Sequence, residues 1–440
     1  MSFLSSSNKR SIKINTTILF LLFLLSGIGI LSLLSTTILP SGTFGDLDIV
    51  YKQLLFIILG FVTYIIFSYI DLTYLKHWQI LLAMYLFTLA LLIITLLFAP
   101  TINFVKRWLI IGGIQIQPSE IAKVTVTILT AVILSKKDTI NEWLLFLISF
   151  LLTLPLAILI YLQPHASMAL LTLTTWFFVA FLGLSNPIRN TTLLMIVSLF
   201  TGAFLLASIT SNHNWYFLLI PGVILTIFAF YSSKPWKNLV LIAFIIGILL
   251  GVISSTVWGN ILKEYQRDRI VVFFNPEGTE SDIGFNVNQS RIAVGSGKIF
   301  GKGFGNGTQS KRNFLPEHQT DFIFASFAEE FGLVGSLFLI TIYGYIILFC
   351  FFTATDIAED PMLSLISLGV GVKILLEVFI NIGTNTGAIP ATGIPLPLMS
   401  AGGSITIMTF LCLALVGNIS SNVSKLSGVK QKNLIDIYEK

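Results

Sequence analysis

The chain has 440 residues, of which 55% are hydrophobic and only 11% are charged. A soluble domain usually carries about 25% charged residues, so this composition excludes a water-exposed globular protein. The formal net charge of +5 does not indicate a nucleic-acid partner, because the Lys and Arg residues cluster at the ends of apolar runs.

The first apolar run extends from about Thr17 to Leu39 and follows three basic residues, Lys9, Arg10 and Lys13. A signal peptide has an apolar core of about 7–15 residues, whereas a membrane-spanning helix needs about 20. Because this run is long and no small-residue cleavage site follows it, we interpret it as an uncleaved first span.

Twelve apolar segments along the chain have the length and hydropathy of membrane spans. They must be helices, because lipid cannot satisfy the polar groups of an exposed backbone. The sequence therefore predicts an all-α integral membrane protein, a multi-pass helical bundle. The predicted spans are 17–38, 51–70, 77–98, 119–135, 143–162, 166–184, 191–209, 214–232, 237–258, 322–353, 361–384 and 403–422.

Basic residues in the connections between spans predict the orientation. The connections on the side of the N-terminus hold most of them, whereas the short connections on the other side hold only Lys106 and Arg107. The positive-inside rule then places both termini in the cytoplasm. Within a single membrane domain, 1–440, we expect nine helices over 17–258, a large extracytoplasmic loop over 259–321, three helices over 322–422 and a cytoplasmic tail over 423–440.

The loop 259–321 departs most from the apolar background. It is dense in Gln, Asn, Arg and Gly, with a glycine at every second position from Gly301 to Gly307. Glycine permits backbone conformations closed to other residues and a close approach to a ligand. Basic side chains of the loop can face phosphate groups, Arg as a bidentate donor and Lys as a point charge. A solvated loop with scattered charge is the simpler alternative.

Asp321 ends this loop, directly before the apolar run that begins at Phe322. It is therefore expected at the depth of the lipid headgroups. A carboxylate there can act as a general base. Thr320 and Asp321 also suit the start of a helix, and the residues alone leave these two roles open.

Two pairs of charged residues lie within predicted spans. Glu120 and Lys123 are three residues apart, so they share a helix face. Ionisable residues in a membrane are costly and usually paired. The pair either holds helices together or lines a substrate cavity. Lys373 and Glu377 form a second pair deep in a later span, which we interpret as structural.

Several motifs together resemble the SEDS family (shape, elongation, division and sporulation), which includes RodA, FtsW and SpoVE. The similarity covers most of the chain and is greatest to the RodA branch. The motifs are Lys106-Arg107-Trp108, Gln117-Pro-Ser-Glu-Ile-Ala-Lys123, the stretch Gly284 to Glu330 with Thr320-Asp-Phe-Ile-Phe324, Asn381-Ile-Gly383, Gly393-Ile-Pro-Leu-Pro-Leu398 and Ser400-Ala-Gly-Gly-Ser404.

The resemblance implies a peptidoglycan glycosyltransferase that polymerises lipid II at the outer face of the cell membrane, with Asp321 as general base. It also implies a class B penicillin-binding protein as partner, contact with membrane lipids, and a divalent cation, Mg²⁺ or Mn²⁺, with ligands that the sequence does not identify. Glu329 and Glu330 are expected to face the substrate cavity. The expected substrate-binding residues are Arg107, Gln117, Glu120, Lys123, Arg267, Gln289, Ser290, Arg291, Lys302, Gln309, Glu317 and Ser400.

Three departures from the family pattern leave alternatives open. His165 stands in Gln163-Pro-His165 where the family has Asp, which puts any role of that carboxylate in doubt, cation coordination included. His318 is shifted by one position, and a pair of spans is added to the usual ten between 185 and 258. A lipid II flippase, a twelve-span secondary transporter and a non-catalytic scaffold for a transpeptidase are the other functions considered.

Overall fold

The computed structural model describes residues 14–39, 41–101, 105–184, 193–199, 282–311 and 317–438, together with short pieces between 223 and 273. In the last helix, side chains are described as far as residue 421. The chain forms two compact units, one of residues 1–180 and 285–440 and one of residues 181–284. The predicted spans 191–209, 214–232 and 237–258 lie mostly outside the described residues, so the added helix pair stays a prediction.

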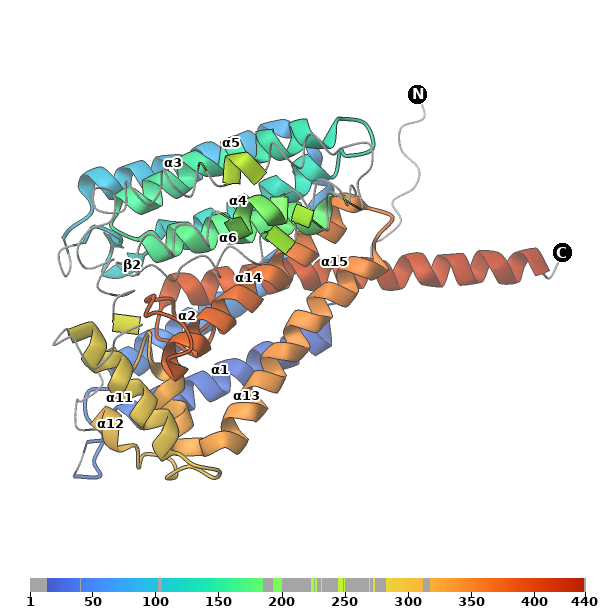
Figure 1. Ribbon diagram of the computed structural model, residues 1–440. Helices are drawn as coiled ribbons and strands as arrows, with labels where there is room; N and C mark the ends of the chain where they lie inside the picture. The colour runs from blue at the N-terminus through green and yellow to red at the C-terminus, as the bar shows by residue number, and fades with distance from the viewer. Residues whose placement is uncertain are drawn as a thin grey trace. The chain divides into compact units, whose positions relative to one another are not determined.

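The larger unit is a helical bundle with one small hairpin (Figure 1). Its elements are α1 (Thr16–Thr36), α2 (Asp48–Tyr69), the 3-10 helix η1 (Leu72–Lys76), α3 (Trp78–Phe98), β1 (Leu109–Ile111), β2 (Ile114–Ile116), α4 (Pro118–Leu134), α5 (Glu142–Leu162), α6 (Ala166–Gly183), α11 (Asp282–Ser296), α12 (Thr308–Lys311), α13 (Ile323–Asp356), α14 (Pro361–Thr386) and α15 (Gly403–Tyr438).

Eight helices in the described part of the chain are long and apolar enough to cross a membrane. They correspond to eight predicted spans, with ends that differ by a few residues. The exception is α15, which continues well beyond the predicted end of its span. The predicted span 119–135 is α4, which has only 17 residues. The predicted extracytoplasmic loop contains a helix of 15 residues, α11, which the sequence analysis did not anticipate.

Local sequence explains where these helices begin and end. Asn15 caps α1 by accepting the amide of Ile18 at 3.1 Å, as N-cap asparagines do. Asp360 caps α14, Pro361 occupies the first helical position, and Gly387 ends the helix in the left-handed region with φ 73°. Before α4, the hairpin β1–β2 turns on two glycines with positive φ, as tight two-residue hairpins require.

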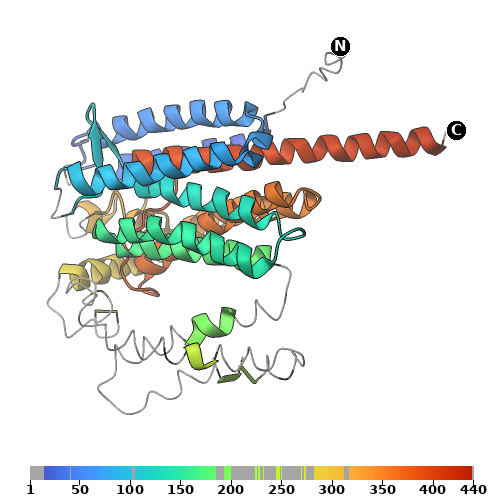
Figure 2. The same cartoon turned by 90° about the horizontal axis from the view of Figure 1, so that it is seen from above.

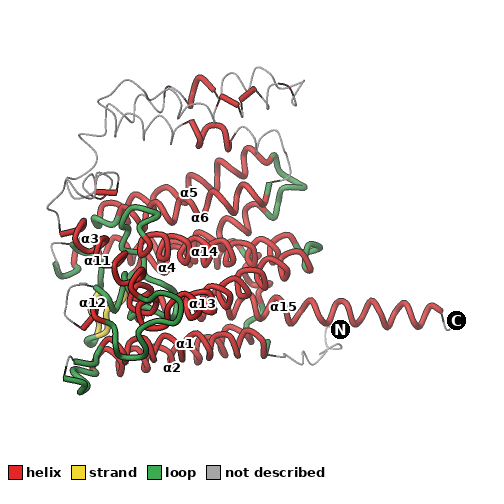
Figure 3. Tube along the Cα trace, turned by 60° about the horizontal axis from the view of Figure 1, so that its bottom comes forward, coloured by secondary structure: helices red, strands yellow, loops and turns green. Residues whose placement is uncertain are grey.

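Helix α4 lies at the centre of the larger unit, and nearly all of its residues are buried. It packs against α3, α5, α14 and α15. Helix α13 lies along α14, and α1, α2 and α15 lie side by side (Figure 2). The hairpin, α11 and α12 gather at one end of the unit (Figure 3). At the other end Lys76, before α3, forms an ion pair of 2.8 Å with Asp360, before α14.

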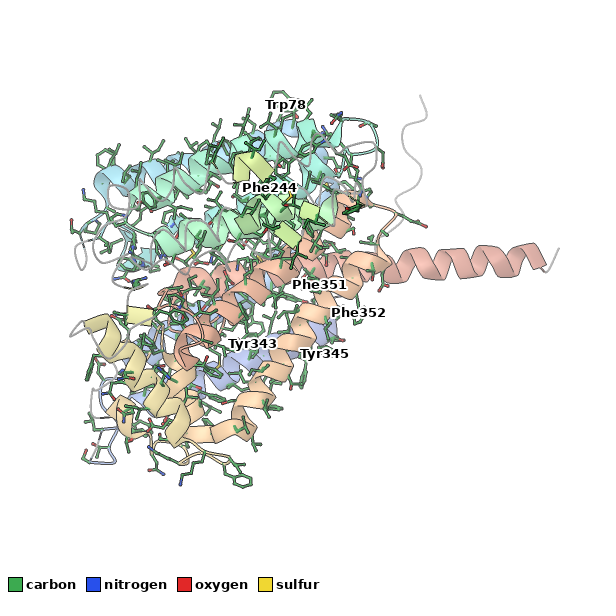
Figure 4. All side chains as sticks on the ribbon, viewed as in Figure 1. Trp78, Phe244, Tyr343, Tyr345, Phe351 and Phe352 are labelled. Carbon is green, nitrogen blue, oxygen red and sulfur yellow. The ribbon has the colours of Figure 1, made fainter. Side chains whose placement is uncertain are left out.

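Many large apolar side chains point out of the bundle, as a lipid-facing surface requires (Figure 4). On α13, Tyr343 is 1% exposed, whereas Phe352 on the outer side is 63% exposed. The Tyr343 hydroxyl donates to the main-chain carbonyl of Pro397, so the buried phenol is satisfied. These features make the chain a multi-pass helical membrane protein.

Helix α13 is interrupted at Gly332, whose φ of 65° and ψ of −162° are not helical. Residues of the glycine-rich segment 297–305 fill the break. The amides of Lys302 and Gly303 donate to the carbonyls of Glu329 and Glu330 at 3.0 and 2.9 Å. The carbonyls of Lys298 and Ile299 accept the amides of Leu333 and Val334 at 2.9 and 3.1 Å. The inserted backbone thus restores the hydrogen bonds that the break removes.

Candidate functional site

Asp321 lies just before α13 and is not its N-cap. The helix begins at Ile323, and Phe322 occupies the N-cap position. The hydroxyl of Thr320 turns back to Glu317, donating to its carboxylate at 2.8 Å. The helix-start role that the sequence left open for these two residues therefore does not describe Asp321.

The main chain on both sides of Asp321 is fixed by donors from residues 381–401. The amide of Ala401 donates to the carbonyl of Gln319 at 2.9 Å, and the hydroxyl of Ser400 donates to the carbonyl of Thr320 at 2.6 Å. The carbonyl of Asp321 accepts two side-chain amides, from Asn381 at 2.9 Å and from Asn385 at 3.0 Å. Three successive carbonyls are thus held from one side, as a precisely placed reactive group needs.

Gly393 borders the carboxylate of Asp321. It has a φ of 70°, a conformation that L side chains rarely adopt, and a Cβ built there would lie 3.2 Å from Asp321 Oδ2. The following residue, Ile394, is tied to the same framework because its carbonyl accepts Asn381 Nδ2 at 2.8 Å. A side chain at position 393 would therefore crowd the Asp321 carboxylate, and glycine leaves it room.

The predicted pairs Glu120–Lys123 and Lys373–Glu377 join into one buried chain of charges. Lys123 Nζ lies 2.8 Å from Glu120 and 2.6 Å from Glu377, and Lys373 Nζ lies 2.9 Å from Glu377. None of the four side chains is exposed. The chain links α4 to α14 and contains two positive and two negative groups. This burial and pairing agree with the structural role left open for Glu120 and Lys123, and their part in lining a substrate cavity stays a prediction.

Glu329 is the centre of a second buried cluster, which holds the glycine-rich segment. Its carboxylate lies 2.6 Å from Lys302 Nζ and also accepts the amide and hydroxyl of Thr308 at 2.9 and 2.7 Å. The amide of Gln309 donates to its second oxygen at 3.2 Å. Glu330 accepts the hydroxyl of Ser35 on α1. The two glutamates thus anchor residues 302–309 and α1, and their place in a substrate cavity stays a prediction.

The other predicted binding residues lie in different surroundings. Around the start of α4, Arg107 donates to the carbonyl of Pro164, and the Gln117 amide lies 3.4 Å from His165 Nδ1. Ser290 and Ser400 are buried, and each donates to a main-chain carbonyl. Gln289 and Gln309 are half-buried, Arg291 and Glu317 are exposed, and Arg267 lies outside the described residues.

The two asparagines that bind the carbonyl of Asp321 have a larger part in this site than the sequence analysis gave them. Asn381 was noted only as part of a motif, and Asn385 was not singled out at all. Both lie on α14 and are 1% and 0% exposed. The signal was a four-residue spacing that continues from Lys373 and Glu377 through Asn381 to Asn385.

No group of three or more His, Cys, Asp or Glu side chains that could hold a metal ion occurs among the residues that the structure describes. His165, where the family pattern has a carboxylate, is 5% exposed and lies beside Gln117. The protein groups present in the described part of the site therefore do not fit a cation held by protein ligands alone.

Comparisons with known proteins agree with one another. The FTSW_RODA_SPOVE family model, described as cell cycle protein, matches residues 15–218 and 186–425. The peptidoglycan glycosyltransferase MrdB of Escherichia coli (strain K12) is 29% identical over 396 residues, which cover 89% of this chain and 91% of that protein. The probable peptidoglycan glycosyltransferase FtsW of Enterococcus hirae is 31% identical over 390 residues, covering 87% and 84%.

Solved structures show the same fold. A chain in a structure described as a peptidoglycan synthase complex aligns with a TM-score of 0.65 at 23% identity, over 93% of this chain and 98% of that one. The rod shape determining protein RodA of Thermus thermophilus aligns with a TM-score of 0.56 at 22% identity, over 92% and 96%.

Proposed function

Because the chain belongs to the FtsW, RodA and SpoVE family, we propose that it is a peptidoglycan glycosyltransferase that uses Asp321 as its general base. Relatives that match most of its length are named as such enzymes. The substrate we propose is lipid II, the undecaprenyl-linked disaccharide peptide. The product is a glycan strand.

The observation that carries this proposal is the fixed position of Asp321. Its carbonyl accepts two buried amides, from Asn381 and Asn385, and its carboxylate borders a glycine. A general base must lie within hydrogen-bond reach of the proton that it removes, so its placement must be tightly controlled.

In the proposed reaction, a sugar hydroxyl of one substrate attacks the anomeric carbon of another. The new carbon–oxygen bond forms while the bond to undecaprenyl diphosphate breaks, and Asp321 takes the proton of the attacking hydroxyl. Positive charge must face the leaving diphosphate. Lys123 and Lys302 are committed to ion pairs. Among the basic residues predicted to bind substrate and described by the structure, Arg291 is the exposed one, and its side chain lies against Gly387 at the end of α14, so we assign this role to Arg291.

We place the loop that contains Asp321 at the extracytoplasmic face of the cell membrane, with both termini in the cytoplasm. The distribution of basic residues supports this orientation. We also propose a class B penicillin-binding protein as partner, supported by the similarity to a chain of a peptidoglycan synthase complex. The cation expected from the family stays a prediction, and no step of the reaction is assigned to it. Titration of Mg²⁺ or Mn²⁺ against a chelator tests it.

Incubation of the purified chain with lipid II separates this function from its alternatives. Glycan strands that form without any other polymerase support the proposal. Transport of lipid II across vesicles without polymer identifies a flippase, whose activity would not need Asp321. If the chain makes no polymer and transports no lipid II but binds a transpeptidase tightly, it is a scaffold. Both of these last results contradict the proposal.

A further inference from the structure

Four polar residues one turn apart form a buried stripe along α14. Lys373, Glu377, Asn381 and Asn385 follow one another at intervals of four, and none is more than 1% exposed. Residues at this spacing lie on nearly the same helix face. Lys373 and Glu377 belong to the chain of charges with Lys123. Asn381 and Asn385 instead donate hydrogen bonds to the main-chain carbonyl of Asp321.

Asn385 uses both atoms of its amide group. Its Nδ2 donates to the carbonyl of Asp321 at 3.0 Å and to the carbonyl of Asn381 at 2.8 Å. Its Oδ1 accepts the amide of Ala325 at 3.0 Å. A main-chain N–H can only donate and a main-chain carbonyl can only accept, so these partners fix the orientation of the amide group.

The same residue connects three helices to Asp321. Ala325 lies in the first turn of α13, and its amide donates both to the carbonyl of Phe322 at 3.1 Å and to Asn385, so Asn385 is also bound to the start of that helix. The main-chain carbonyl of Asn385 accepts the hydroxyl of Ser290 on α11 at 2.8 Å. Asn385 thus holds the chain that directly follows the Asp321 side chain and ties it to α11 and α14.

We propose that Asn385 is a positioning residue for Asp321, holding it in place through the carbonyl of Asp321 and the amide of Ala325. This inference rests on the proposed role of Asp321 as general base. To bind both of these groups, the side chain at position 385 must be short and must carry both a donor and an acceptor. Leucine has neither, and the hydroxyl of serine is too short to reach both partners.

The test compares Asn385→Leu and Asn385→Ser with a matched control, Thr386→Val. Thr386 is the next residue of α14 and is exposed, and its hydroxyl donates to the carbonyls of Ile382 and Gly383 within the same helix. Each purified full-length variant is given lipid II over a range of concentrations, and its thermal unfolding is measured. Asp321→Ala is assayed in parallel, so that failure of the base assignment is recognised separately.

We expect the Asn385 variants to fold and their maximal polymerisation rate to fall about 10- to 100-fold, as for a misplaced catalytic group. The lipid II concentration for half-maximal rate should stay within two-fold of the control. The positioning role is overturned by rates equal to Thr386→Val while Asp321→Ala is inactive. It is also overturned by a loss confined to the half-maximal concentration, or by failure of both variants to fold.

Discussion

Lys123 on α4 and Glu377 on α14 form an ion pair of 2.6 Å in which neither side chain is exposed. The residues are 254 positions apart in the chain. Each has a second partner, Glu120 for Lys123 and Lys373 for Glu377. The two lysines and the two glutamates therefore balance one another in charge. Removal of a single member leaves an uncompensated charge in the bundle.

Glu377→Gln should destabilise the protein strongly, because Lys373 then loses its carboxylate partner and Lys123 keeps only Glu120. Loss of one partner of a buried pair costs about 3–5 kcal/mol. The double variant Lys373→Met/Glu377→Gln should regain most of this loss, since it leaves Glu120 and Lys123 as a balanced pair. Thermal unfolding in detergent measures both. Equal stability of the single and double variants would show that charge balance does not hold α4 against α14.

Gly332→Ala should destabilise the break in α13. The φ and ψ of Gly332 are essentially restricted to glycine, which alone costs about 1–3 kcal/mol for another residue. A Cβ there would also lie 2.3 Å from the amide nitrogen of Gly301. Gly344→Ala in the same helix is the control, because a Cβ there meets nothing within 4 Å. A thermal unfolding temperature of Gly332→Ala equal to that of the control would contradict the docking of segment 297–305 in the break.

Glu329→Gln should destabilise the 297–311 segment more than Lys302→Met does. The carboxylate of Glu329 accepts donors from Lys302, Thr308 and Gln309, whereas Lys302 donates only to Glu329 and Thr308 among the hydrogen bonds described. An amide at position 329 cannot accept this many donors. Limited proteolysis of the 297–311 segment and thermal unfolding both report the difference. The opposite order would show that Lys302, not Glu329, organises the segment.

Arg291→Ala should reduce polymerisation of lipid II, and Arg291→Lys should restore part of the rate. A hydrogen bond to a charged group is worth about 1.5–3 kcal/mol, which corresponds to roughly a 10- to 100-fold change in rate. Lys52→Ala is the control, since Lys52 is exposed and pairs only with Asp48 in the described part of the chain. An unchanged polymerisation rate of Arg291→Ala would show that Arg291 does not bind the leaving diphosphate.

Hydropathy and length predicted the described spans because lipid imposes a single strong requirement on each segment. They could not predict that α4 is the buried centre of the unit, or that Lys123 meets Glu377, because such pairings depend on how distant segments pack. The break at Gly332 was hidden for the same reason, since its partners lie in segment 297–305. Asp321 was found through a local motif, whereas Asn385 acts through a contact 64 residues away.

The polymerisation rate of Asp321→Ala with purified lipid II tests the central claim most directly. Asp48→Ala is the matched control, because Asp48 is an exposed carboxylate that pairs with Lys52. We expect Asp321→Ala to remain folded and to lose about 10²- to 10⁴-fold of the rate, as removal of a general base does, while Asp48→Ala stays near the unmodified protein. A folded Asp321→Ala variant that makes glycan strands at a near-normal rate would contradict the account.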